Sequence, residues 1–233
     1  MYISTVFATA RSLTNPVLGV DACKSAWVAI RLGSSVTAHY AEHIADLPTD
    51  VSVIAIDIPI GLPDRGRRTA DVAARGLLGP RRSSVFLTPV RAALTETTHA
   101  RASTVNRQLA GEGMSIQAFG LFPKIREVDT WRRTASCRVV EAHPELSFRE
   151  MAGDPIPDSK KTWAGLEHRR RLLAENGIRF PADLGDAGRQ AAPDDILDAA
   201  AVAWTAARVA AGTAQPLPDP PDDYDEFTVA IWR

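Results

Sequence analysis

Acidic residues occur in segments of this chain that otherwise carry little charge. Asp21 lies in GVDACKSAW, Asp57 lies within the apolar run VSVIAIDIPIGLP, and Glu141 ends the segment CRVVEA. Asp195 and Asp198 are spaced i, i+3, so on a helix they project from one face. Oxygen ligands of this kind suit Mg²⁺ or Mn²⁺ rather than Zn²⁺, and two such ions can stabilise the attacking and leaving oxygens in phosphodiester cleavage. These acids are therefore candidate catalytic residues.

Each of these carboxylates also has a structural interpretation. A charged group in a buried strand is costly unless it is paired, and hydrogen bonds or an arginine could satisfy Asp57 as well as a metal could. Asp21 could be a turn residue before the next strand. Asp194 follows a proline and is a natural N-cap. Asp195 would gain from the helix dipole in a first turn, whereas Asp198 lies one turn further in and would gain less.

The hydrophobic pattern predicts the elements that must hold these acids. Three antiparallel strands are expected at 17–20, 26–32 and 35–40, and a strand buried on both faces at 51–58. A short strand at 137–142 and an edge strand at 227–232 follow. Helices are expected at 67–78, 97–111, 121–133, 144–151, 160–176 and 195–211. This is an α/β order, and neither an internal repeat nor a linker divides residues 1–233, so we expect a single domain.

A basic, proline-rich segment lies between the predicted strands. Residues 80–94, PRRSSVFLTPVRAAL, are long for a connection in a compact domain, which favours a functional loop. Residues 64–91 hold seven arginines and two aspartates, a local excess of five positive charges. The candidates for contacts to phosphate oxygens are Arg81, Arg82, Ser84, Lys124 and Arg126. The alternative for each is a solvated surface position.

His143 has two interpretations. Its unperturbed pKa lies near neutrality, so it could assist proton transfer or orient water. It could instead be a hydrogen-bonded residue ahead of the helix that starts at Pro144, which is the favoured interpretation. The tryptophans Trp27, Trp131 and Trp204 lie within apolar patterns, which favours core positions over base-stacking platforms.

Composition excludes several classes of protein. With 233 residues, of which 45% are hydrophobic and 24% charged, the chain can bury a sizeable core and is unlike disordered or fibrous sequences. Cys23 and Cys137 have neither the number nor the spacing of a disulfide framework or a zinc site. No apolar run approaches the roughly 18–20 residues that span a bilayer, and residues 1–10 lack the pattern of a signal peptide. We therefore expect a cytoplasmic location and no membrane partner.

Six segments, in order along the chain, carry a resemblance to a known family. They are GVDACKSAWVAI (19–30), IAIDIPIGLP (54–63), LLGPRRSSVFLTPVR (77–91), QAFGLFPKIREVD (117–129), VVEAHPELSF (139–148) and DDILDAAAVAWTA (194–206). The chain resembles, over nearly its whole length, the uncharacterised bacterial family of unknown function 429, whose members are labelled predicted nucleases with an RNase H-like fold.

The resemblance implies a mixed five-stranded sheet with its first three strands antiparallel, flanked by helices, here with a helical and loop insertion. In enzymes of that fold one acid comes from the first strand, one from the fourth and one or two from a late helix. In this sequence those positions correspond to Asp21, Asp57, Asp195 and Asp198. The resemblance therefore implies that these four aspartates are ligands of Mg²⁺ or Mn²⁺. Glu141 is a family motif position that could reach the site from the fifth strand.

The leading hypothesis is a metal-dependent nuclease that hydrolyses phosphodiester bonds in nucleic acid. The first alternative is a nucleotide-binding phosphotransferase or NTPase of the same superfamily, although the chain has no GxxxxGK[ST] phosphate loop. The second is a non-catalytic binding module that holds its partner with the arginine loop. A net charge of -1 counts against tight nonspecific binding of long DNA and favours a small or structured nucleic acid. A homodimer is compatible with the sequence.

Overall fold

The computed structural model describes residues 15–223 and 228–233. Its strands are β1 (Val17–Cys23), β2 (Ala26–Leu32), β3 (Val36–Ala41), β4 (Val53–Ile56), β5 (Arg138–Ala142), β6 (Pro216–Asp222) and β7 (Val229–Trp232). Its α-helices are α1 (Thr69–Leu78), α2 (His99–Ala110), α3 (Ile116–Gly120), α4 (Phe122–Trp131), α5 (Pro144–Ala152), α6 (Trp163–Glu175), α7 (Gly185–Gln190) and α8 (Pro193–Ala210). Short 3-10 helices are η1 (Ile44–Asp46), η2 (Gly79–Ser84) and η3 (Arg91–Thr95).

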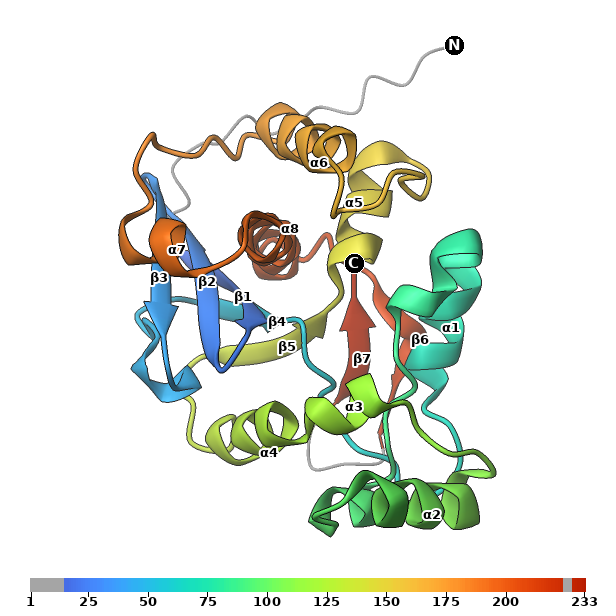
Figure 1. The fold of residues 1–233 in the computed structure, drawn as a ribbon. Helices are drawn as coiled ribbons and strands as arrows, with labels where there is room; N and C mark the ends of the chain where they lie inside the picture. Colours follow the sequence, from blue (N-terminus) through green and yellow to red (C-terminus); the bar gives the residue numbers. More distant parts are fainter. Residues whose placement is uncertain (1–14, 224–227) are drawn as a thin grey trace.

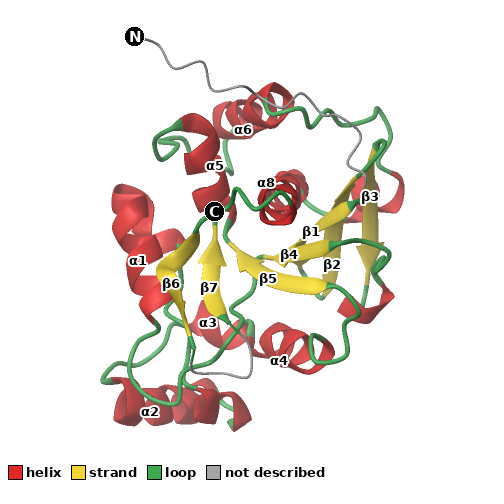
Figure 2. Ribbon diagram, turned by 180° about the vertical axis from the view of Figure 1, so that it is seen from behind, coloured by secondary structure: helices red, strands yellow, loops and turns green. Residues whose placement is uncertain are grey.

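The strands form one mixed sheet in the order β3-β2-β1-β4-β5-β7-β6 (Figures 1 and 2). Strands β1, β2 and β3 are antiparallel neighbours, as predicted. β4 pairs parallel to β1, and β5 pairs parallel to β4. The α/β class is thus confirmed, and the two central parallel pairings bring the carboxyl ends of β1, β4 and β5 to one edge of the sheet.

The predicted number of five strands is wrong, because the sheet described has seven. β7 pairs with β5 and lies inside the sheet, not at its edge, while β6 forms the edge. β6, with the proline-rich sequence PLPDPPD, was not among the predicted strands. Proline is tolerated on an edge strand because one side of that strand makes no ladder hydrogen bonds. Phe227, predicted to begin the last strand, lies outside the described residues.

Helix α8 packs on one face of the sheet and α4 on the other (Figures 1 and 2). α8 approaches β1 so closely that a Cβ at Gly19 would lie 2.1 Å from the backbone nitrogen of Ala203 and 2.2 Å from the carbonyl oxygen of Ala199. Only glycine fits this position. The alanine-rich face of α8 and Gly19 therefore fix how far each acid on the helix lies from the sheet.

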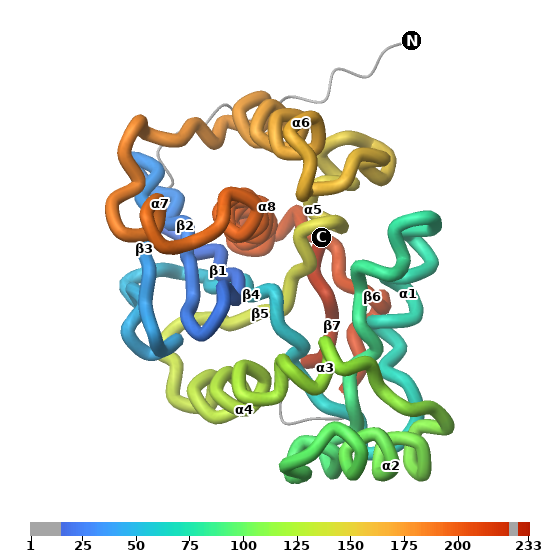
Figure 3. The backbone as a smooth tube through the Cα atoms, in the orientation of Figure 1, coloured from blue at the N-terminus to red at the C-terminus, as the bar shows by residue number. Residues whose placement is uncertain are grey.

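The chain leaves the sheet after β4 and returns at β5, and Figure 3 shows this excursion running beneath and beside the sheet. It contains α1 to α4 together with η2 and η3, so the predicted helical and loop insertion is present. The expected helices are all found, although α6 begins three residues later than predicted and α8 two residues earlier. The short helices α3 and α7 were not predicted. Among the described residues, no helix combines the length and apolar character needed to cross a membrane.

Candidate functional site

Asp21 and Asp57 are brought together by the parallel pairing of β1 and β4. Val20 pairs with Ile56, and the backbone N–H of Asp57 donates to the carbonyl oxygen of Val20 at 2.9 Å, so Asp21 lies beside Asp57. Asp57 was predicted inside a buried strand; it instead follows the end of β4 and is half-buried. Its position at the carboxyl edge is where catalytic groups of parallel sheets commonly lie.

Both carboxylates face α8. Side chains alternate along a strand, and on β1 and β4 the odd-numbered positions, such as Val17 and Val53, pack in the core that contains α8. Asp21 and Asp57 share that parity. The first turns of α8 carry Asp195 and Asp198, of which Asp198 is buried, with 2% of its surface exposed. β1, β4 and α8 thus bring the four predicted metal ligands together.

Lys160, in the segment before α6, lies among these acids. Its Nζ hydrogen-bonds to Oδ2 of Asp198 and lies 3.8 Å from Oδ2 of Asp194. Burial alone would lower the pKa of Lys160, but the charges of Asp198, Asp21 and Asp57 outweigh that effect and raise it. The ammonium group therefore serves as an internal counter-cation for the carboxylate cluster.

The pKa values of the clustered acids are raised, because the carboxyl groups are buried and lie close to one another. Burial raises the pKa of Asp21 well above its usual value, and the charges of Asp57 and Asp198 raise it further, against Lys160. Burial raises the pKa of Asp198 to about 6 despite its contact with Lys160. The pKa values of Asp57 and Asp195 are raised as well, first by burial in both cases. Ionised together, these groups are a strained set of negative charges that a further cation would relieve.

This crowding predicts a pH-dependent stability in metal-free protein. Because folding raises the pKa of Asp21, the stability that its carboxyl contributes is fully present below the unfolded pKa of 3.8 and is lost as the pH rises through the higher folded value. Asp21→Asn should therefore increase the free energy of unfolding at pH 8 and change it much less at low pH. Each tenfold difference in proton affinity between the folded and unfolded states corresponds to about 1.4 kcal/mol. Urea unfolding in EDTA at several pH values measures this; an equal difference at every pH would contradict it.

Glu141 is placed differently from the other predicted acids. Along β5 the even positions Val140 and Ala142 face the α8 core, so Glu141 faces the other side of the sheet. Its carboxylate accepts two hydrogen bonds of 2.6 Å from Arg68 and one of 2.7 Å from the backbone N–H of Ile60. Arg68 also binds Asp71. This buried Asp71–Arg68–Glu141 network uses both oxygens of Glu141, so the structure places it in a supporting ion pair beside the cluster.

His143 lies at the same edge of the sheet, at the start of α5. Its Nε2 lies 3.2 Å from the carbonyl oxygen of Ser84, which ties it to the predicted arginine loop. Its Nδ1 is buried and has no hydrogen-bond partner among the described residues. Its positive form lowers the pKa of Asp57, which places the imidazole near the cluster. Each interpretation of His143 is therefore supported by one ring nitrogen. The contact of Nε2 with Ser84 fits a structural residue, and the unpartnered Nδ1 fits a group that transfers a proton.

The predicted phosphate contacts separate into two groups. Arg81, from η2, is half-buried and lies 3.4 Å from Glu145, and Arg82 beside it is exposed. Ser84 lines the cavity described below and donates to the carbonyl oxygen of Arg81. Glu145, which sequence reasoning missed, also binds the buried Arg169 at 2.7 Å.

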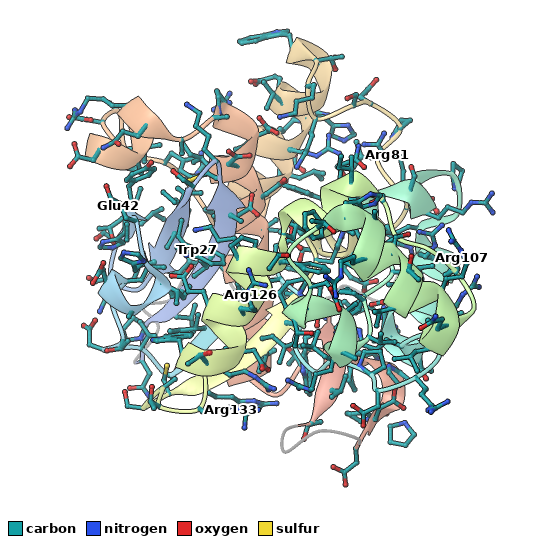
Figure 4. All side chains as sticks on the ribbon, turned by 60° about the horizontal axis from the view of Figure 1, so that its bottom comes forward. Trp27, Glu42, Arg81, Arg107, Arg126 and Arg133 are labelled. Atoms are coloured by element: carbon teal, nitrogen blue, oxygen red, sulfur yellow. The ribbon has the colours of Figure 1, made fainter. Side chains whose placement is uncertain are left out.

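Lys124 and Arg126 belong to α4 and do not line the cavity. Lys124 donates to the carbonyl oxygen of Ser25 and lies 4.2 Å from the ring centre of Trp27. Arg126 donates to the carbonyl oxygen of Leu94. Figure 4 shows Arg126 on α4 and Arg81 in a different part of the same view. The structure therefore gives both α4 side chains structural contacts.

The buried or packed positions of the three predicted core tryptophans are confirmed. Both cysteines are free thiols.

Asp194 was expected as the N-cap of the late helix, but α8 begins at Pro193 with Ala192 as N-cap. Proline fits the first helical turn because its missing N–H would have no partner there. Asp194 instead binds Lys161 at 2.6 Å.

The cluster opens into a cavity of about 200 Å³. Its polar lining comes from Asp21, Asp57, Arg68, Asp71, Ser84, Glu141, His143, Lys160 and Asp195. Its apolar lining comes from Ala22, Pro59, Val85, Phe86, Leu121 and Ile231. Charged and polar groups therefore converge in a cavity that also has apolar lining, a combination that can hold a small molecule or a nucleotide.

The acids fit a divalent cation by their chemistry. Oδ1 of Asp198 is buried and has no hydrogen-bond partner among the described residues, which is costly unless something else satisfies it. All four candidate ligands are aspartates, and their carboxylate oxygens are the ligand atoms that Mg²⁺ and Mn²⁺ prefer. Within 15–223 and 228–233, no three acidic, histidine or cysteine side chains are already arranged as a ligand cluster. In this structure the ammonium group of Lys160, which pairs with Asp198, supplies the positive charge beside the acids.

A family model described as "Protein of unknown function (DUF429)" matches residues 19–223. No curated protein and no solved structure matches the chain.

Proposed function

Because the chain belongs to the DUF429 family, a family of unknown function, we propose its activity from the site itself: a Mg²⁺- or Mn²⁺-dependent nuclease that hydrolyses phosphodiester bonds in nucleic acid. One observation carries the proposal. Asp21, Asp57 and Asp198 come from separate elements, have raised pKa values, and share one lysine ammonium as their counter-cation. Groups whose pKa values are perturbed by burial and by close charges cluster at functional sites.

The strand order supports an RNase H-like core within the larger sheet. The five strands β3-β2-β1-β4-β5, with β1, β2 and β3 antiparallel, match the arrangement that the sequence resemblance implies. The acids also fall on the elements expected for that fold, with one on β1, one after β4 and two on α8.

Asp21, Asp57, Asp195 and Asp198 would hold the metal. A bound divalent ion supplies Lewis-acid stabilisation of the charge that develops on the phosphate during hydrolysis. The protein's own groups supply the rest. His143, held by the carbonyl oxygen of Ser84, keeps Nδ1 free to accept or deliver a proton beside Asp57.

Lys160 provides a test of metal binding that needs no substrate. Its ammonium competes with a cation for Asp198, so Lys160→Met should bind Mn²⁺ about tenfold more tightly than wild type, a change of about 1.4 kcal/mol. Asp198→Asn should bind Mn²⁺ much more weakly. Lys161→Met is the matched control, because Lys161 contacts Asp194 from a side chain that is 68% exposed, and it should change the affinity little.

Isothermal titration calorimetry on the three variants and the wild type measures these affinities. Wild-type affinity in Asp198→Asn, or no Mn²⁺ binding by wild type and Lys160→Met alike, would contradict the proposed metal site.

A further inference from the structure

Phe86 is a large aromatic side chain that the fold leaves partly in solvent. It is 39% exposed and lines the cavity together with its neighbours Ser84 and Val85. Its backbone is anchored on both sides: Arg75 donates to the carbonyl oxygen of Val85 at 2.7 Å, and the N–H of Thr88 donates to Asp71 at 2.6 Å. Phe86 is therefore presented at the cavity by a fixed segment.

The cavity is lined by two kinds of group. Carboxylates, Lys160 and His143 are one kind, and the apolar side chains of Pro59, Val85, Phe86, Leu121 and Ile231 are the other. A nucleotide has the matching division, because its phosphate needs charged and metal groups whereas its base offers a flat, largely apolar face. A substrate that was only a phosphate would leave the apolar lining without a partner.

A second exposed aromatic lies next to the site in the sequence. Trp163, the first residue of α6, is 80% exposed and follows the cavity residue Lys160 by three positions. The other exposed large hydrophobic residues among those described are Val72, Phe86 and Ile116, so both aromatic members of the set belong to segments that reach the cavity. Exposed aromatics near lysines are typical of surfaces on which unpaired bases stack.

We propose that the cavity takes an unpaired nucleobase stacked on Phe86, and that the substrate is accordingly single-stranded DNA or RNA. This inference rests on the proposed nuclease function and narrows its substrate class. In a duplex the base faces are already stacked on their neighbours, so reaching Phe86 would require the base to be unstacked at a cost. A single strand offers its bases at a lower cost.

Binding of fluorescently labelled oligothymidylate and oligouridylate tests the inference, with the same DNA strand annealed to its complement as the duplex. Measurements use anisotropy, with Ca²⁺ replacing Mg²⁺ to keep the strands intact. Phe86→Ala should weaken binding of at least one single strand about tenfold, because stacking contributes about 1–3 kcal/mol per base. Phe86→Trp should retain the affinity. Ile116→Ala, which removes an exposed side chain outside the cavity, should leave it unchanged.

Equal affinity of wild type and Phe86→Ala for the single strands, or duplex binding as tight as single-strand binding, would overturn the inference while leaving a nuclease in place. If the wild type bound neither single strand nor duplex, the proposed function itself would fail.

Discussion

Arg68→Met should lower the free energy of unfolding by about 3–5 kcal/mol, the typical cost of leaving buried charges without their partner. The side chain of Arg68 is 1% exposed and neutralises two carboxylates, Asp71 and Glu141, whose own exposures are 1% and 6%. Methionine matches much of its volume but none of its hydrogen bonds. Because Asp71 also accepts from the N–H of Thr88, the segment that carries Phe86 should loosen as well.

Equilibrium unfolding in urea measures this loss, with Arg67→Met as the matched control. Arg67 pairs with Glu112, but its side chain is 56% exposed, so solvent can replace that partner and the stability should hardly change. Equal effects of the two substitutions would show that the Asp71–Arg68–Glu141 network does not stabilise the fold.

Asp198→Asn should reduce metal-dependent cleavage by about a thousandfold. The loss of one charged ligand removes several kcal/mol of transition-state stabilisation, and about 1.4 kcal/mol corresponds to a factor of ten in rate. The substitution keeps the shape of the side chain, and it relieves repulsion among buried acids, so the variant should remain folded. Single-turnover cleavage with Mg²⁺ gives the rate.

Asp194→Asn is the control for this experiment. Asp194 is the neighbouring buried acid on α8, but its close ion-pair partner is Lys161 and it is not one of the four candidate metal ligands. A rate loss in Asp194→Asn as large as in Asp198→Asn would mean that general disturbance of the first turns of α8, not loss of a ligand, explains the effect.

The grouping of the four aspartates could be predicted because it depends on local patterns and one topological expectation. Asp21 and Asp57 each follow an apolar segment, and Asp195 and Asp198 lie about one turn apart on a helix. Once β1 and β4 pair in parallel, these residues come together. The position of Glu141 on the opposite face could also have been predicted, since alternation along RVVEA separates it from the face that Val140 and Ala142 share.

Other parts of the site depend on contacts that have no local signal. Lys160 lies 38 positions before Asp198 in the sequence and looked like the polar start of a helix. Glu145 is held by Arg169, another distant partner. Lys124 and Arg126 carry the positive charge that a phosphate contact needs, but the sequence could not show that their side chains hydrogen-bond to backbone carbonyl oxygens. The prolines of β6 obscured its strand character in the sequence. They are tolerated because β6 lies at the edge of the sheet.

The most direct test of the central claim is cleavage by the wild-type protein of a labelled panel: single- and double-stranded DNA, RNA, an RNA/DNA hybrid and a four-way junction. We predict cleavage of at least one single-stranded member with Mg²⁺ or Mn²⁺, abolished by EDTA and by Asp21→Asn. Failure to cleave any member with either metal, or cleavage that persists in EDTA or in Asp21→Asn, would contradict the assignment of this carboxylate cluster as a metal-dependent nuclease site.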